Sequence, residues 1–247
     1  MVMKLENKIQ KFKEIVSSSE SIVFFGGAGV STESNIPDFR SDKGIYNKNN
    51  DSISPEEILS HHFFMSSPEK FYKFYREKMI YKNALPNITH LALAKLEGEG
   101  KVKAVITQNI DGLHQDAGSK NVLELHGSVR RNFCMKCHKF YDLNYILETK
   151  GVPKCSCGGI IKPDVVLYEE ALDDKVLHDS LKYISNCETL IIGGTSLTVY
   201  PAAGLVTYFK GKNLIIINKG ITEYDKYANL VIDDSLGNVF KEILKDE

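Results

Sequence analysis

Short apolar runs that each end in a polar or glycine-rich cluster are the feature that most constrains this fold. The runs have the length of buried strands and cover residues 21–25, 102–107, 122–125, 189–192 and 214–217. Because they are continuously apolar, we expect both faces of each strand to be buried, as in a parallel sheet. Helices are predicted at 89–97 and 172–184, and an amphipathic helix precedes the first run. The sequence therefore predicts an α/β chain with a Rossmann-like, doubly wound parallel sheet.

The clusters that follow these runs carry chemically versatile side chains. They are Gly26–Gly29, Gln108–Asp111, His126–Gly127, Gly193–Ser196 and Asn218. For any one cluster, an ordinary polar loop is an equally good interpretation. In open α/β sheets, however, ligands bind outside the carboxyl ends of the strands. Five such clusters at one edge therefore predict a ligand site there.

Two stretches depart from this alternation of strands and helices. Residues 42–85 indicate a loop and then helices, with many aromatic residues between Phe63 and Tyr81, and residues 130–162 hold four clustered cysteines. We expect a helical insert and a metal-binding insert that together form a smaller subdomain beside the sheet. With about 100–200 residues per domain, residues 1–247 are predicted to be one domain that contains both inserts.

Composition and charge exclude several classes of protein. The chain has 31 Lys and Arg against 32 Asp and Glu, and this balance argues against broad electrostatic binding to nucleic acid. No apolar run approaches the roughly 18–20 residues of a membrane span. The first residues alternate charged and apolar side chains and lack the apolar block of a signal peptide. We expect a cytoplasmic protein.

Four of the five cysteines have the spacing of a zinc site. Cys134 and Cys137 are separated by two residues, and Cys155 and Cys157 by one, followed by a Gly158-Gly159 turn. Structural zinc takes four tetrahedral thiolate or imidazole ligands, so four cysteines leave no open position for catalysis. Free thiols or a redox role are the alternative. Cys187 lies alone among apolar residues and is expected to fill space in the core.

The first cluster has the character of a phosphate-binding loop. Gly27-Ala28-Gly29 follows a predicted strand, and we expect a helix after it whose free N–H groups face a pyrophosphate. The third glycine of the usual dinucleotide fingerprint is replaced by Thr32, so an ordinary strand-to-helix turn remains an alternative. An aromatic residue and a cation, Phe39 and Arg40, follow downstream, where they could cover a bound ligand.

Over nearly its whole length the chain resembles the sirtuins, the NAD-dependent protein deacylases. The motifs that carry the resemblance occur in the family's order, with the zinc module between the fourth and fifth. They are Gly27-Ala28-Gly29-Val30-Ser31, Ile36-Pro37-Asp38-Phe39-Arg40, Gln108-Asn109-Ile110-Asp111, His126-Gly127, Pro163-Asp164-Val165-Val166, Gly194-Thr195-Ser196 and Val199-Tyr200-Pro201-Ala202, with Asn218 after the last clear strand.

The resemblance implies an NAD-dependent protein-lysine deacetylase with one structural zinc. In such a reaction the acyl-lysine carbonyl oxygen attacks the ribose carbon as nicotinamide leaves, and an alkylimidate forms. The products are lysine, nicotinamide and O-acetyl-ADP-ribose. His126 is implied as general base on a ribose hydroxyl, and Asn109 as the residue that orients water or ribose hydroxyls. A histidine suits this step because its reference pKa of about 6.5 leaves much of it neutral, although a lone histidine at a strand end is more often structural.

The resemblance also implies which residues contact NAD. Ile110 and Asp111 would form the nicotinamide pocket, although Asp111 alone could equally be a helix cap, and Arg40 alone could be a surface ion-pair residue. The full implied set is Gly27, Ala28, Gly29, Thr32, Phe39, Arg40, Gln108, Ile110, Asp111, Gly194, Thr195, Ser196, Asn218, Lys219 and Ser235.

The peptide substrate is expected to enter by strand addition, along 164–168 and 197–200. Val165 and Val166 would flank the lysine stem, unless they are plain strand core. Sirtuins selective for acidic acyl groups carry a Tyr-x-x-Arg pair, and alignment places Tyr75 and Lys78 at its positions. Lysine cannot form the planar bidentate contact of arginine with a carboxylate. We therefore expect acetyl-lysine to be preferred over succinyl-lysine.

Some positions depart from the family pattern, and other functions stay open. Gly26 replaces a common hydroxyl residue, Asn35 replaces a glycine, and Tyr168-Glu169-Glu170 replaces Phe-Gly-Glu. If the glycine position needs positive φ, Glu169 strains or reshapes the peptide-binding edge. The alternatives are a deacylase for longer or acidic acyl groups, a mono-ADP-ribosyltransferase, a zinc-containing dehydrogenase, and a non-catalytic zinc-module adaptor.

Overall fold

A six-stranded parallel sheet forms the larger part of the molecule. The computed structural model describes residues 3–38, 44 and 53–245. In the order β3-β2-β1-β7-β8-β9, the strands are Val122–Glu124, Val102–Thr107, Ile22–Gly26, Thr189–Gly193, Asn213–Ile217 and Leu230–Ile232. Gly26 pairs with Thr107 on one side and with Gly193 on the other. β1 therefore lies where the strand order reverses, which is the ligand-binding position of doubly wound sheets.

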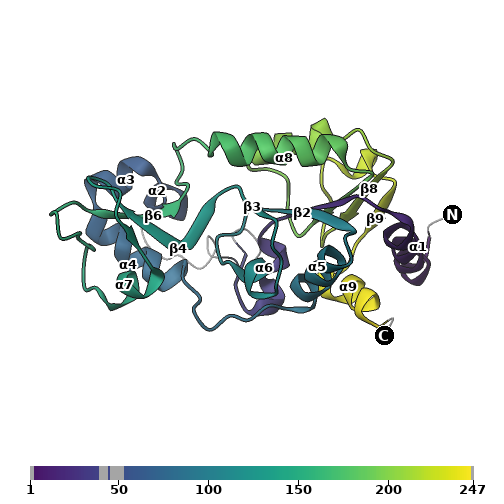
Figure 1. Cartoon of the computed structure of the whole chain (residues 1–247), viewed down its shortest axis with the longest axis horizontal. Coiled ribbons are helices and arrows are strands. Elements are labelled where there is room, and N and C mark those ends of the chain that lie inside the picture. The colour runs from purple at the N-terminus through teal and green to yellow at the C-terminus, as the bar shows by residue number, and fades with distance from the viewer. Residues whose placement is uncertain (1–2, 39–43, 45–52, 246–247) are drawn as a thin grey trace.

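Helices cover both faces of this sheet, as the continuously apolar strands predict. α1 (Leu5–Ser18), α5 (Ile88–Gly98) and α9 (Leu236–Leu244) contribute to a core on one face, where Phe12 and Phe24 pack edge-on against Phe240. α8 (Asp174–Asn186) and the 3-10 helix η3 (Ala202–Tyr208) cover the other face (Figure 1). The prediction of a Rossmann-like fold is confirmed.

A smaller module stands beside the sheet, at the left of Figure 1. Its antiparallel sheet has the order β5-β4-β6, with β4 at Gly127–Cys134, β5 at Phe140–Tyr141 and β6 at Ile161–Val165. Its helices are α2 (Pro55–Ile58), α3 (His61–Ser66), α4 (Pro68–Lys78) and α7 (Leu143–Glu148). They enclose an aromatic core in which Phe64, Phe71, Tyr72 and Tyr75 are buried. The insert boundaries 42–85 and 130–162 stay predictions.

The connection between the two parts runs through β4, which begins directly after His126 and continues into the module (Figure 1). Gly127 adopts φ +74, and an added Cβ there would overlap the carbonyl oxygen of Asp164. Only glycine fits this turn, because it alone tolerates the left-handed region without a side-chain clash.

The remaining elements are short. They are the turns η1 (Ala28–Val30), η2 (Thr32–Ser34) and η4 (Asp225–Tyr227) and the single-turn helix α6 (Leu113–Asp116). Among the described residues, no helix combines the length and the apolar character needed to cross a membrane.

Candidate active site

A cavity of about 920 Å³ lies where the carboxyl ends of the main strands face the small module. Its walls come from the segments that follow β1, β2, β7 and β8, from the segment after β6, and from residues 78–84. Every described residue of the predicted NAD set lines it, together with His126, Asn109, Val165, Val166 and Lys78. Phe39 and Arg40 lie outside the described residues.

The glycine loop after β1 differs from the prediction. The structure has the two 3-10 turns η1 and η2 where we expected a helix, so that prediction is wrong. Ser31 sits between the turns at φ -96°, ψ 0°, and Asn35 ends the second turn at φ 62°. Pro37 follows and has no N–H to continue a helix. Asparagine tolerates the left-handed region better than most residues, which explains how it replaces a glycine here.

Two glycines allow the loops after β1 and β7 to touch. The Gly29 N–H donates to the Gly194 carbonyl at 2.8 Å. A Cβ on Gly29 would stand 2.6 Å from Gly194 Cα, and Gly194 itself has φ +60. Both positions therefore need glycine. Both glycines also line the cavity.

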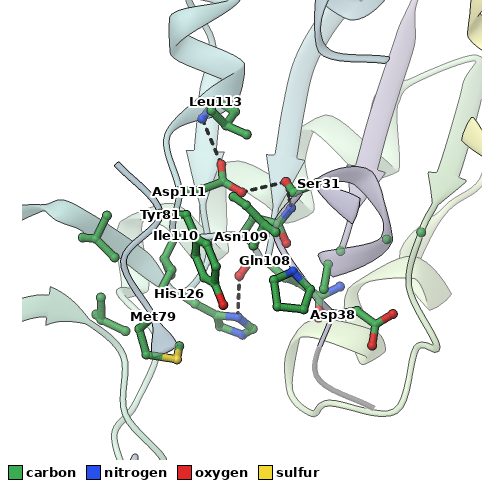
Figure 2. A pocket seen from close by; sticks show the side chains of 18 of the residues that line it. Ser31, Asp38, Met79, Tyr81, Gln108, Asn109, Ile110, Asp111, Leu113 and His126 are labelled. Carbon is green, nitrogen blue, oxygen red and sulfur yellow. Dashed lines mark hydrogen bonds between the residues drawn. The ribbon is translucent and has the colours of Figure 1, made fainter. Parts of the chain in front are cut away.

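The segment after β2 gathers polar groups around Ser31, as Figure 2 shows. Ser31 Oγ donates to Asp111 Oδ2 at 2.7 Å and accepts from Asn109 Nδ2 at 3.0 Å. The other oxygen, Asp111 Oδ1, accepts at 2.9 Å from the N–H of Leu113, the first residue of α6. Asp111 therefore lines the cavity and holds the start of α6, while Gly112 occupies the cap position.

His126 has one ring nitrogen engaged by the backbone. Its Nδ1 lies 3.0 Å from the carbonyl oxygen of Gln108 (Figure 2). A carbonyl oxygen can only accept, so Nδ1 carries the hydrogen, and Nε2 of the neutral ring holds the free electron pair. Burial lowers the pKa of His126, and the hydrogen bond to Gln108 partly opposes this. The environment therefore favours the neutral, basic form of the ring.

Further contacts tie this histidine to its neighbours. Gln108 Nε2 donates to Thr195 Oγ1 at 3.1 Å, which joins the loops after β2 and β7. The His126 carbonyl accepts from the Val166 N–H at 3.0 Å. The segment after β6 is therefore held directly against the histidine backbone.

The predicted adenosine-side residues follow β7 and β8 or precede α9. Asn218 and Lys219 directly follow β8, and Ser235 caps α9 by accepting from the Asn238 N–H at 3.3 Å. Thr195 and Ser196 follow β7. All five line the same cavity as His126.

Four thiols meet at the tip of the small sheet, outside the cavity wall. The sulfurs of Cys134, Cys137, Cys155 and Cys157 all lie within 4.8 Å of one another. Tetrahedral zinc with bonds of about 2.3 Å would place sulfurs roughly 3.8 Å apart, and the 3.4 Å from Cys134 to Cys157 and 3.6 Å from Cys137 to Cys155 come close to this. The donor set fits a closed structural zinc site.

The turns around the thiols agree with this assignment. Gly158, at φ +83, donates its N–H to the Cys155 carbonyl at 2.8 Å and so closes the turn that contains Cys157. Among the described residues, the group that could hold a metal contains the four cysteines and not His138. Cys187 is buried away from them, and its Sγ donates to the Ile184 carbonyl at 3.3 Å, so it fills the core as expected.

The structure separates the two residues predicted to read the acyl group. Lys78 lines the cavity, whereas Tyr75 is fully buried and stacked on Phe71 with ring centroids 5.5 Å apart. Helical spacing alone gave the pair one face, but the aromatic core draws Tyr75 inward. Met79 and Tyr81, which follow Lys78 in the chain, line the same cavity as His126 (Figure 2).

Sequence reasoning assigned no role to several residues of the site. Ser31 bonds to both Asp111 and Asn109. Its position at the end of the glycine motif was the feature of the sequence that could have indicated a place in the site. Arg130 donates from Nε to the Asp111 carbonyl at 3.3 Å and forms an ion pair with Asp116. No spacing in the sequence predicts that contact, because it depends on how β4 crosses α6.

The comparisons with known proteins agree with this geometry. Residues 27–201 match the model of the Sir2 family. The chain belongs to the Sir2 family. A protein of Clostridium perfringens named NAD-dependent protein deacetylase is 62% identical over 243 residues, which cover 97% of this chain and 100% of that protein. A second protein of that name, from Clostridium acetobutylicum, is 62% identical over 245 residues, or 98% of this chain and 100% of its own length.

Solved Sir2 structures show the same fold. A complex of Sir2 with a p53 peptide and NAD+ superposes with a TM-score of 0.85 at 38% identity, covering 99% of this chain and 98% of that one. A Sir2 structure bound to an acetylated peptide gives a TM-score of 0.85 at 36% identity, with coverages of 99% and 98%.

Within the Sir2 family, two departures of this chain now have a structural account. Glu169 does occupy a positive φ of 75°, as its replacement of a glycine suggested. At Gly26, an added Cβ would stand 2.7 Å from the Phe24 ring, so a hydroxyl residue would require that ring to move.

Proposed function

We propose that this chain is an NAD-dependent protein-lysine deacetylase that converts NAD, acetyl-lysine and water to nicotinamide, O-acetyl-ADP-ribose and lysine. The observation that carries the proposal is His126, whose neutral Nε2 is available in the cavity that also holds the Ser31–Asn109–Asp111 cluster. The Sir2 complexes with NAD+ and with acetylated peptide support the choice of both substrates.

Each group of cavity residues has a role in this proposal. Gly27, Ala28 and Gly29 carry no bulky side chains, so their backbone can approach the pyrophosphate closely. Thr32 flanks the pyrophosphate. Asp111 and Ile110 hold the nicotinamide carboxamide, with Ser31 fixing the orientation of the Asp111 carboxylate. Thr195, Ser196, Asn218, Lys219 and Ser235 contact the adenosine half. Val165 and Val166 flank the lysine stem.

His126 acts as a general base at Nε2. The Gln108 carbonyl holds the Nδ1 hydrogen and so fixes the tautomer, while the lowered pKa keeps Nε2 unprotonated near neutral pH. Asn109, held by Ser31, orients the ribose hydroxyls from which His126 takes a proton. The NAD co-substrate supplies the electrophilic ribose carbon.

Zinc has a structural role in the proposal. The four thiolates would complete its coordination, and metal binding would contribute folding free energy to the small sheet. A reducing compartment keeps such thiols free of disulfides, so we place the protein in the cytoplasm.

The decisive experiment combines the purified protein with NAD and an acetyl-lysine peptide and analyses the products by mass spectrometry. Stoichiometric nicotinamide, O-acetyl-ADP-ribose and deacetylated peptide are expected. The His126→Ala variant should lose turnover but retain NAD binding, because it removes a base and no phosphate contact.

Two results would contradict the proposal. Loss of the acetyl group without NAD would exclude the mechanism. Transfer of label from NAD onto protein, with no deacetylated peptide, would instead identify a mono-ADP-ribosyltransferase.

A further inference from the structure

Glu170, at the end of the segment after β6, is in contact with three different parts of the small module. Its Oε2 accepts from Lys162 Nζ at 2.9 Å and from the Leu167 N–H at 2.9 Å, while its Oε1 lies 2.8 Å from His61 Nδ1. The side chains of Glu170 and Lys162 are each only 19% exposed. Although burial raises the pKa of Glu170, these hydrogen bonds outweigh it and keep the carboxylate ionised. Charge-assisted bonds of this kind are among the stronger ones in proteins.

Glu169 forms a second link to the same helix. Its φ of 75° is a conformation that few residues other than glycine adopt. Its Oε2 accepts from the His62 N–H at 2.9 Å, at the start of α3. A glycine here would relieve the backbone but offer no such bond. The carboxylate therefore helps to hold a backbone shape that the side chain itself disfavours.

The backbone between these contacts is also bonded to α3 and the turn before it. The Tyr168 carbonyl accepts from the His61 N–H at 3.0 Å, and the Tyr168 N–H donates to the Leu59 carbonyl at 3.0 Å. α3 is anchored in turn by Phe63 and Phe64, which are buried in the aromatic core. The segment Val165–Glu170 is thus attached on one side to a well-packed helix.

The other side of this segment faces the proposed chemistry. Val165, Val166 and Leu167 line the cavity, and the Val166 N–H donates to the His126 carbonyl. Movement of Val165–Glu170 away from α3 would widen the part of the cavity that is proposed to hold the lysine stem. The glycine loop and the residues after β8 would stay in place.

We propose that Glu169 and Glu170 are positioning residues that clamp the segment Val165–Tyr168 between α3 and His126 and so set the affinity for the acyl-lysine peptide. The clamp rests on the proposed deacetylase function. It acts on the peptide side of the cavity and leaves the NAD side unchanged.

The test compares kinetic constants for the two substrates. Glu170→Gln removes the charge that pairs with Lys162, and it should raise the peptide KM about tenfold, with the NAD KM and kcat changed by less than about twofold. Glu169→Ala loses the bond to His62 while still needing positive φ, and it should raise the peptide KM more than Glu169→Gly. Glu169→Gln keeps an oxygen acceptor and should retain a KM within about twofold of wild type.

Controls separate positioning from loss of fold. The exposed Glu148 on α7 belongs to the same module, and Glu148→Gln should change no kinetic constant. Zinc content and thermal unfolding are measured for every variant. Should Glu170→Gln fail to fold, Lys162→Met tests the same ion pair from its other partner.

The clamp is wrong if folded variants keep the wild-type peptide KM, or if the peptide and NAD KM values rise equally. Fluorescence anisotropy of a labelled acetyl-lysine peptide without NAD measures the clamp independently of turnover. The two proposals can fail separately. If the wild type binds the peptide more tightly than Glu170→Gln does but shows no NAD-dependent turnover, the clamp is supported and the proposed function is wrong.

Discussion

At the scale of single residues, His126 illustrates how the protein environment sets the protonation state of the proposed general base. Burial lowers its pKa and the Gln108 carbonyl selects its tautomer. The base must be unprotonated, so activity falls as pH drops through the pKa. Since this pKa lies below the usual 6.5, the acid limb of the kcat/KM profile should have its midpoint below pH 6.5. A midpoint at or above pH 7 would contradict the assignment.

Two other histidines form a buried pair, to which the proposed reaction assigns no role. His90 and His114 are buried with ring centroids 4.7 Å apart. Burial lowers the pKa of His90 to about 4, partly opposed by Asp111 and Asp116. Burial and the neighbouring His90 hold the pKa of His114 well below its usual range. Both rings are therefore neutral in the folded protein.

This pair should make the fold sensitive to acid. The unfolded chain protonates histidine near pH 6.5 and so binds more protons than the folded state below that pH. Stability should be full above about pH 6.5 and decrease on acidification by up to about 1.4 kcal/mol per pH unit for each histidine, levelling off for His90 near pH 4. Urea unfolding between pH 5 and 7.5 measures the slope. His114→Phe should reduce it, while the exposed His178→Gln control should not.

At the scale of elements, β4 runs from the proposed general base, His126, to the cysteine cluster at Cys134. Removing zinc, or replacing Cys155 by Ala, should unfold the small sheet, because metal binding supplies folding free energy there. Far-UV circular dichroism and protease digestion would detect the change within residues 127–165, and readdition of zinc should restore the wild type only. A stable, fully active Cys155→Ala protein without zinc would refute the four-cysteine site.

α4 presents one cation to the cavity, and this bears on the choice of acyl group. Lys78 lines the cavity but cannot form the two parallel bonds that arginine gives a carboxylate. Acetyl-lysine should therefore exceed succinyl-lysine in kcat/KM by about tenfold or more, which corresponds to roughly 1.4 kcal/mol. Lys78→Arg should raise succinyl turnover. Equal use of both peptides by the wild type would contradict this.

The elements also show where sequence reasoning succeeds. The run 102–107 was predicted at the observed bounds of β2, and the other four predicted runs match β1, β3, β7 and β8 to within one residue at each end. They were recognisable because strands buried on both faces are mostly apolar. β9 has only three residues, too few to stand out. The helix predicted after Gly29 fails because Asn35 and Pro37 do not continue a helix. The burial of Tyr75 in the aromatic core was not predicted, because helical spacing does not say which face of a helix meets a core. The contacts of Glu169 and Glu170 with α3 join residues over a hundred positions apart and have no local signal.

At the scale of the whole molecule, Arg131 joins the two parts. Its Nη1 donates to Glu124 Oε2 at 2.6 Å on β3, and its Nε donates to Asp164 Oδ2 at 2.7 Å on β6. Glu124 has a side chain only 8% exposed, so losing Arg131 removes the charge partner of a largely buried carboxylate, which keeps the hydrogen bond from Gln115 Nε2. Arg131→Met should lower the unfolding free energy by about 1–3 kcal/mol in urea titrations. Arg131→Lys should recover part of the lost unfolding free energy. An unchanged urea midpoint for Arg131→Met would show that the ion pairs of Arg131 contribute nothing to stability.

The strand order has a consequence for how the chain acquires its shape during synthesis. β1 is the first strand to be synthesised, and one of its two neighbours is β7. Its hydrogen bonding on that side cannot form fully until residue 193 has been made. Among the residues that the structure describes, the buried core of the small module is drawn from the range between Ile58 and Leu167. Domains fold as units as they leave the ribosome, and long-range parallel pairing is slow. The metal-binding part should therefore mature first, so that zinc supply at that moment, rather than NAD, decides how many nascent chains reach the finished enzyme.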